Sequence, residues 1–249
     1  MKALHFAKPL EFRLETPAET LTQGESFSGT FQATNRGAEA LDRLDLQVTL
    51  AYAEFKALKE SPESAFAVQE HLELAADATL EPGGEFAAPW SLALASDCPI
   101  TSKTGGLFLL YGEGWERPGR FGKLDLRVTL APVVEAYLAT LENVFSFVAA
   151  SCRFDGAFTE VRLTPPSRYA TLERLQLLIR YREEGMELVY QAKVKGFDRG
   201  RSGLTSKNVT LEQKLAPDQV LMGGNRPNRA FFKTSIESTL GELVPPILQ

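Results

Sequence analysis

The chain is poor in the residues that most often carry chemistry. Its 249 residues include two cysteines, Cys98 and Cys152, and two histidines, His5 and His71. Two cysteines exclude a disulfide-rich scaffold and a zinc cluster built on cysteine. His-dependent catalysis needs a histidine with partners converging on it, and nothing near His71 in the sequence supplies them. Residue chemistry alone therefore points to no reaction, and we expect no cofactor, no metal and no enzymatic activity.

Long apolar runs are also missing. The N-terminus lacks the apolar core of a signal peptide. The most apolar window of 20 residues, 131–150, contains Glu135 and Glu142, so we expect no membrane span and a cytoplasmic protein with reduced cysteines. The motifs of phosphate loops, serine hydrolases, zinc peptidases and C-x-x-C redox proteins are absent from the sequence.

Charge is unevenly distributed along the chain. The net charge is −5, but residues 1–150 hold 12 basic against 21 acidic residues, a net of −9, and residues 151–249 hold 15 against 11, a net of +4. An acidic chain argues against general nucleic-acid binding. The two halves could attract each other or present separate patches to different partners, and a chance difference in charge is the plain alternative.

What the sequence does contain is strict alternation of apolar and polar residues. The clearest run, residues 44–52, places five apolar side chains at every second position. Such a period predicts a strand with one face on a core and the other in water, as in antiparallel sheets. Similar runs are separated by Gly and Pro turn formers, a pattern typical of a β-sandwich. The runs include residues 10–14, 27–33, 90–94 and 124–130.

Residues 131–148 break this rhythm. Their apolar side chains recur every three or four positions, and Pro132 suits the first turn of a helix. We therefore expect one amphipathic helix, and a buried pair of strands is the alternative. Alternation then returns, with a hairpin turning at Gly185. The polar face of that hairpin carries Arg174, Arg180, Arg182, Gln191 and Lys193. The segment from 221 is rich in Gly, Pro and Asn, and we expect it to wrap the surface, with a short ordered segment near Phe231 and Phe232.

One basic cluster is the candidate site for partner binding. It comprises five cations that lie close together in the sequence with one acid among them: Lys193, Lys195, Arg199, Arg201 and Lys207. Glycines interrupt this segment, which predicts a flexible loop. Such a loop would suit an acidic or phosphorylated partner or an anionic lipid surface. The alternative is a solvated loop that faces the acidic first half. Phe197 is the one aromatic residue there, so single-stranded nucleic acid is not expected.

The remaining candidates for chemistry have simpler interpretations. We expect His71 to face solvent on the polar side of a strand. Cys98 and Cys152 lack a neighbouring His or helix N-terminus to lower their pKa, so we expect inert thiols. The glycines near Tyr111 precede another strand and form a hairpin connection, since a phosphate loop would open a helix.

The first 130 residues resemble the N-terminal domain of the arrestin-like family. The resemblance rests on an early strand, residues 10–14, and on five later segments taken in order: residues 23–31, 44–52, 89–94, 99–101 and 122–130. Length and second half together resemble most closely the bacterial sporulation-control proteins of the stage zero, M type. In those proteins a segment like Pro132–Leu138, running to Phe147, follows the arrestin-like domain.

The resemblance implies a mainly β fold of two tandem antiparallel β-sandwich domains, with one amphipathic helix near the junction. We expect an arrestin-like domain over residues 1–130, a second domain opened by a helix over 131–220, and a turn-rich tail over 221–249. It also implies a non-enzymatic regulator or scaffold that binds proteins through sheet edges and loops. Exposed edge strands, with their unpaired N–H and C=O groups, would also allow self-association.

Two other functions stay open on the sequence alone. One is an enzyme or small-ligand binder that uses carboxylates and aromatic side chains such as Trp90, Tyr111 and Trp115. The other is a sensor of anionic membrane surfaces that uses the basic loop.

Overall fold

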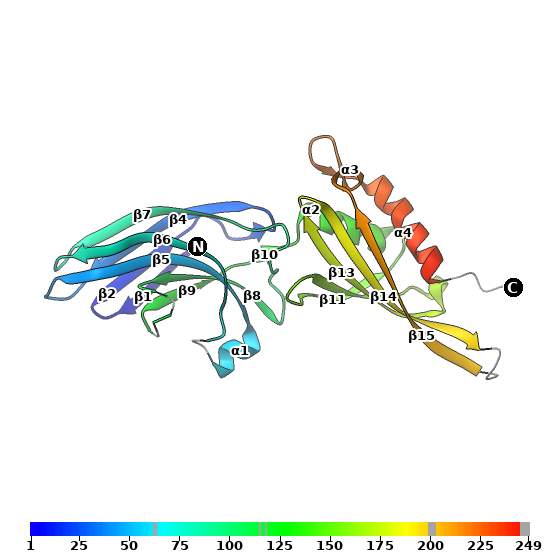
Figure 1. Ribbon diagram of the computed structural model, residues 1–249, viewed down its shortest axis with the longest axis horizontal. Coiled ribbons are helices and arrows are strands. Elements are labelled where there is room, and N and C mark those ends of the chain that lie inside the picture. The colour runs from blue at the N-terminus through cyan, green and yellow to red at the C-terminus, as the bar shows by residue number, and fades with distance from the viewer. Residues whose placement is uncertain (62–63, 115, 118, 199–202, 245–249) are drawn as a thin grey trace. The chain divides into compact units, whose positions relative to one another are not determined.

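A computed structural model describes residues 1–61, 64–114, 116–117, 119–198 and 203–244. The chain divides into two compact units, Met1–Thr129 and Leu130–Gln249, each considered by itself (Figure 1). Unit 1 contains strands β1 (Lys2–Ala7), β2 (Leu10–Glu15), β3 (Leu21–Thr22), β4 (Ser26–Asn35), β5 (Leu41–Glu54), β6 (Ala67–Leu80), β7 (Glu85–Ala93), β8 (Gly105–Gly112), β9 (Phe121–Asp125) and β10 (Val128–Thr129), and helix α1 (Phe55–Glu60).

Unit 1 is a sandwich of two antiparallel sheets. One sheet has the strand order β1-β2-β4-β7 and the other β6-β5-β8-β9. Alternate residues of β2, β4, β5 and β7 point into a shared apolar core, as the period of two predicts, whereas Leu80 is the one fully buried residue that β6 adds to it. Strand β8 departs from this alternation because all its residues are buried. Its Leu107 and Leu109 face the main core, while Phe108 and Leu110 form a second, smaller core that α1 covers.

Gly29 of β4 marks a close approach inside this sandwich. It pairs with Trp90 of β7, and a Cβ at position 29 would lie 2.6 Å from the Trp90 ring. The ring instead meets Phe27 edge-on at 5.4 Å between centroids. The same Cβ would lie 1.9 Å from the backbone carbonyl oxygen of Glu15. Glycine is therefore required here by space, since any side chain would collide with both this oxygen and the indole.

Unit 2 is built on one antiparallel sheet of order β11-β12-β13-β14-β15. Its elements are α2 (Pro132–Asn143), β11 (Val148–Phe154), β12 (Thr159–Thr164), η1 (Ser167–Tyr169), β13 (Leu172–Arg182), β14 (Gly185–Asp198), β15 (Gly203–Leu215), α3 (Pro217–Val220), β16 (Leu221–Met222), β17 (Arg226–Pro227) and α4 (Arg229–Leu243). Helices α2 and α4 pack on one face of the sheet (Figure 1). Tyr137, Tyr190 and Phe232 lie fully buried between the two layers.

These elements confirm a mainly β fold with antiparallel sheets, and they confirm the helix near the junction. Gly185 also adopts the positive φ, 123°, that the hairpin requires. The last segment differs from the expected turn-rich tail, because α4 occupies 15 residues of it. Its buried side chains Phe232, Ile236, Leu240 and Leu243 recur at helical spacing and supply apolar cover for the sheet. In unit 2 the layer that packs on the main sheet is thus helical.

Candidate functional site

The predicted basic cluster is not a loop in the described residues. Strands β14 and β15 continue through most of it, with Lys193 paired to Asn208 and Lys195 paired to Ser206. Lys207 pairs with Val194, so its side chain belongs to the opposite face of the sheet, because successive residues of a strand alternate. Arg199 and Arg201 lie outside the described residues. The structure therefore keeps Lys193 and Lys195 together and places Lys207 apart from them.

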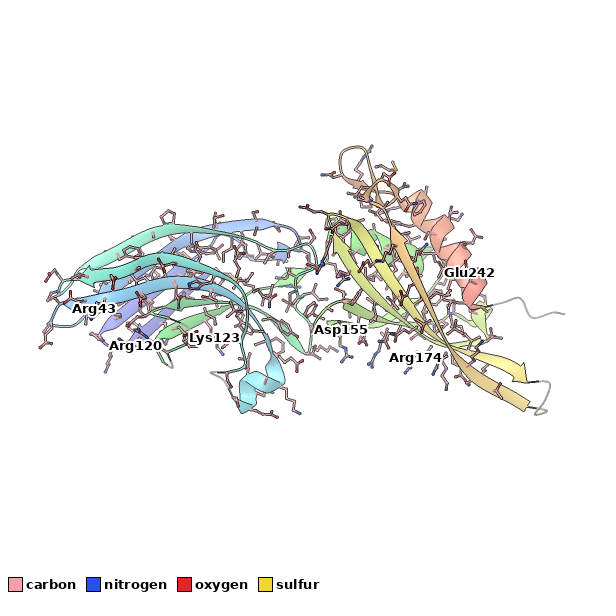
Figure 2. All side chains as sticks on the ribbon, in the orientation of Figure 1. Arg43, Arg120, Lys123, Asp155, Arg174 and Glu242 are labelled. Carbon is pink, nitrogen blue, oxygen red and sulfur yellow. The ribbon has the colours of Figure 1, made fainter. Side chains whose placement is uncertain are left out.

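Lys193 and Lys195 belong to a larger charged surface on the sheet of unit 2. This surface, here named the cationic face, is the side of the sheet opposite α2 and α4, and no helix among the described residues of unit 2 covers it. A β-bulge between Leu172 and Arg174 places Glu173 and Arg174 on it together (Arg174 is labelled in Figure 2). Its charged members are Arg153, Glu160, Arg162, Glu173, Arg174, Arg180, Arg182, Glu187, Lys193, Lys195, Glu212 and Lys214.

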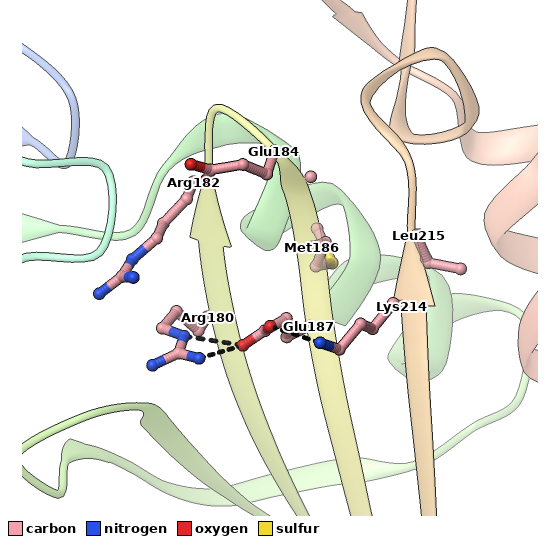
Figure 3. A pocket seen from close by; sticks show the side chains of 8 residues that line it. Arg180, Arg182, Glu184, Met186, Glu187, Lys214 and Leu215 are labelled. Atoms are coloured by element: carbon pink, nitrogen blue, oxygen red, sulfur yellow. Dashed lines mark hydrogen bonds and ion pairs between the residues drawn. The ribbon is translucent and has the colours of Figure 1, made fainter.

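The most regular part of the cationic face is a row that crosses three strands. Arg180 of β13, Glu187 of β14 and Lys214 of β15 are direct cross-strand partners. The Arg180 guanidinium donates two hydrogen bonds to Oε2 of Glu187, the one from Nε being 2.8 Å long. The Lys214 ammonium lies 3.3 Å from the other oxygen, Oε1 (Figure 3). Opposite charges directly across a sheet stabilise the pairing of its strands.

A second carboxylate, Glu160, is held by two arginines. Its side chain is on β12 and the residue is only 3% exposed. Arg153 of β11 donates to Oε2 from Nη2 at 2.7 Å and from Nε at 3.1 Å, and Arg162 donates to Oε1 at 2.9 Å. The carboxylate can therefore be both buried and charged, because each of its oxygens accepts a hydrogen bond from an arginine.

The third carboxylate, Glu173, is held by Lys193 and Lys195, two members of the predicted basic cluster. The Lys193 ammonium lies 2.9 Å from Oε2 and the Lys195 ammonium lies 3.7 Å from Oε1. The Ser206 hydroxyl donates to Oε2 at 3.2 Å. The same arrangement therefore occurs three times on one face, with one glutamate between two cations, and we call each such group a trio.

All three glutamates titrate below their ordinary range. The hydrogen bonds from Arg180 and Lys193 lower the pKa of Glu187 and of Glu173, respectively. Burial by itself would raise the pKa of Glu160, but the hydrogen bonds from Arg153 and Arg162 outweigh it and lower this pKa as well. The carboxylates are consequently ionised at neutral pH, and each trio carries one uncompensated positive charge.

A hollow of about 250 Å³ lies at the turn end of β13 and β14, at the edge of the cationic face (Figure 3). Arg180, Arg182, Glu187 and Lys214 of that face line it together with Glu184 and Gly185 of the turn and with Met186 and Leu215 from the other side of the sheet. At the middle of the face, Leu178 and Val189 pair directly across β13 and β14 and are half-buried. The surface therefore has an apolar centre between charged groups.

Unit 1 contains a different hollow, of about 410 Å³, lined by exposed acids and a histidine: Asp45, Gln47, His71, Glu73, Gly114, Glu116 and Arg117. His71 is exposed, and its Nδ1 lies 3.0 Å from the Thr49 hydroxyl. The described part of the chain contains no group of three or more His, Cys, Asp or Glu side chains arranged to hold a metal ion.

The other candidates for chemistry lie in or against the cores. Burial raises the pKa of Cys98 to about 12 and that of Cys152 to about 11, so both thiols are protonated at neutral pH. Trp90 and Tyr111 are core residues with 3% and 1% exposure, which removes them from any binding surface. Trp115 lies outside the described residues.

No helix within the described ranges is long and apolar enough to cross a membrane.

Sequence reasoning identified five cations of the cationic face but not the trios. Arg174, Arg180, Arg182 and Lys193 were visible as the polar side of one hairpin, and Lys195 as part of the basic cluster. Glu160 and its two arginines were not found, because their assembly depends on which strands become neighbours. The usable signal is the run Glu160-Val161-Arg162, which puts opposite charges on one side of a strand.

Comparison with solved structures finds a protein with a similar fold. The structure is similar to the sporulation control protein Spo0M from Bacillus subtilis, with a TM-score of 0.66 and 16% sequence identity over 94% of this chain and 98% of that one. This likeness confirms the arrestin-like resemblance at the level of the fold. No family model matches the sequence, and no curated protein matches it.

Two further solved structures match about half of the chain. The alkylpurine DNA glycosylase AlkC from Pseudomonas fluorescens gives a TM-score of 0.32 at 14% identity, covering 49% of this chain and 30% of that one. A β-glucosidase from Listeria innocua gives a TM-score of 0.28 at 14% identity, covering 48% and 16%. At these scores neither likeness bears on function.

Proposed function

We propose that the chain is a non-enzymatic regulatory protein that works by binding another protein through unit 2. The observation that carries this proposal is the cationic face: a sheet surface that no helix in the described part of unit 2 covers, with an apolar centre and ordered ion pairs around it. Protein interfaces commonly combine an apolar centre with a polar rim. The fold likeness to a sporulation control protein supports a regulatory role by analogy.

The test is reconstitution from pure components. The full chain is purified from its natural host under native conditions, a co-purifying protein is identified by mass spectrometry, and the two proteins are then mixed in pure form. We expect a complex of fixed stoichiometry with a Kd below about 10 µM near physiological salt, as for a specific though transient interface. Failure of every co-purifying protein to bind the pure chain would contradict the proposal.

A second candidate function has one observation in its favour. The hollow of unit 1 gathers His71 with three carboxylates, those of Asp45, Glu73 and Glu116, and such a set would suit a small cationic or polyhydroxylated ligand. All three carboxylates are exposed, however, and catalytic acids usually need a desolvated site that tunes their pKa. A metabolite that raises the Tm of the native chain, but not that of a His71→Ala variant, would favour this candidate.

A further inference from the structure

We infer that the cationic face binds an extended acidic segment of the partner protein, one with an apolar side chain between its acids. This inference rests on the proposed function and adds to it the chemistry of the partner and the residues that recognise it. The charge balance of the three trios, their spacing and the apolar pair that lies between them support it.

The charge balance of the face is positive and fixed in place. Each trio sets two cations around one carboxylate, so the three trios together present six cations against three acids. The glutamates hold the arginine and lysine side chains in defined positions before any partner arrives. Binding then costs less side-chain entropy than it would with free lysines and arginines. Arg174 and Arg182 add two positive charges, and Glu212 adds one negative charge.

The spacing of the trios fits a polypeptide segment. Along β14, Glu187 and Lys193 are six residues apart, which corresponds to about 20 Å of strand. A single phosphate cannot contact both ends of that distance, whereas an extended segment of about six residues can. Leu178 and Val189 lie between the two ends, about 7 Å from the Arg180–Glu187 row. They would receive an apolar side chain placed between two acidic ones.

The interspersed carboxylates argue against a uniformly charged partner. A nucleic-acid backbone or an anionic bilayer presents dense negative charge, which would meet Glu173 and Glu187 as well as their cations. A peptide can place its acids opposite the cations and leave uncharged residues opposite the glutamates. The guanidinium carbon of Arg180 lies 4.6 Å from the centroid of the Phe158 ring. This ring is therefore already covered and offers no free surface on which a nucleic-acid base could stack.

The experiment measures binding of a labelled peptide to the full chain by fluorescence anisotropy. The peptide has about ten residues, with Glu and Ser alternating on either side of a central Leu. The test variant replaces one exposed cation of each trio: Arg162→Gln, Lys193→Gln and Lys214→Gln. The matched control removes three exposed lysines of unit 1: Lys2→Gln, Lys56→Gln and Lys123→Gln. Both variants change the net charge from −5 by the same amount.

We expect the face variant to weaken peptide binding by about tenfold or more and the control variant by less than about twofold. Conservative exchanges at the same three positions (Arg162→Lys, Lys193→Arg and Lys214→Arg) should retain binding. Circular dichroism checks that each variant is folded. Should the face variant fail to fold, Lys214→Glu alone serves instead, because the Lys214 side chain is 81% exposed, and it should weaken binding several-fold.

Several results would overturn the inference. They are absence of peptide binding, an equal effect of both triple variants, or tighter binding of oligo(dT) or of phosphatidylserine vesicles that the face variant abolishes. Failure of this inference is separable from failure of the proposed function. If the partner binds the face variant as tightly as it binds the wild type, the proposal that the chain binds a protein is retained. The inference that the cationic face binds an acidic segment is then wrong.

Discussion

Replacing Glu160 by Gln should destabilise unit 2 without weakening its positive surface. The carboxylate accepts three hydrogen bonds from two arginines while the residue is 3% exposed. A hydrogen bond to a charged group contributes about 1.5–3 kcal/mol, but the Arg153 and Arg162 side chains are 41% and 54% exposed and regain water when the charge is lost. We therefore expect the free energy of unfolding to fall by about 2 kcal/mol, less than for a fully buried pair.

The assay for Glu160→Gln is urea unfolding followed by circular dichroism, together with hydrogen exchange resolved by peptide. Hydrogen exchange is needed to locate the loss of stability, because the two units need not unfold in a single transition. We expect the loss in β11 and β12. Glu212→Gln on the same face is the matched control, since Glu212 is exposed, and it should change stability by less than about 0.5 kcal/mol. Equal stability of wild type and Glu160→Gln would refute the reasoning that the trio stabilises the sheet.

The pH dependence of this effect has a defined sign. The folded pKa of Glu160 lies below the ordinary value of 4.5, so the ionised carboxylate stabilises the fold at pH values above 4.5. That contribution is lost as the pH falls through the lowered folded pKa. The stability difference between wild type and Glu160→Gln should therefore shrink at low pH. A difference that persists unchanged at pH 2 would contradict the assignment of the effect to charge.

Three further predictions follow from packing and thiol burial. Tyr190→Phe removes the buried hydroxyl contact with Tyr137 and should lower the free energy of unfolding by about 1–2 kcal/mol in urea titrations; an unchanged midpoint would contradict it. Gly29→Ala places a methyl group against the Trp90 ring and should lower the Tm by several degrees, whereas Gly223→Ala, with open space around it, should not. Because the pKa of Cys98 is raised to about 12, its labelling by a disulfide reagent at pH 8 should be at least about a hundredfold slower in the native chain than in urea; equal rates would contradict its burial.

Most of the fold was predicted from the two-residue alternation of apolar side chains and from the Gly and Pro residues at the turns. Runs such as residues 44–52 mark strands whichever partner they find, so the sandwich of unit 1 was accessible from the sequence. Helix α4 was not, because its four buried apolar residues are spaced among polar ones and follow a Gly- and Asn-rich turn. Their helical period becomes visible only over the full length of the segment.

The site was less accessible than the fold for a physical reason. A sequence shows which residues share one side of a strand, but the trios also require strand order and register. Glu187 meets Arg180 and Lys214 only because β14 lies between β13 and β15. Lys207 shows the converse: it is close to Lys195 in sequence, yet the hairpin register places it on the helix-covered side of the sheet. Two cations of one basic cluster in the sequence can therefore lie on opposite faces of the folded sheet.

The most direct test of the cationic face is zero-length cross-linking of the reconstituted partner complex. A carbodiimide joins lysine amines to carboxylates in contact, and mass spectrometry then locates the joined residues. The proposed surface predicts partner carboxylates attached to Lys193, Lys195 and Lys214. Attachment confined to lysines of unit 1, such as Lys2, Lys56 and Lys123, would show that the partner binds elsewhere.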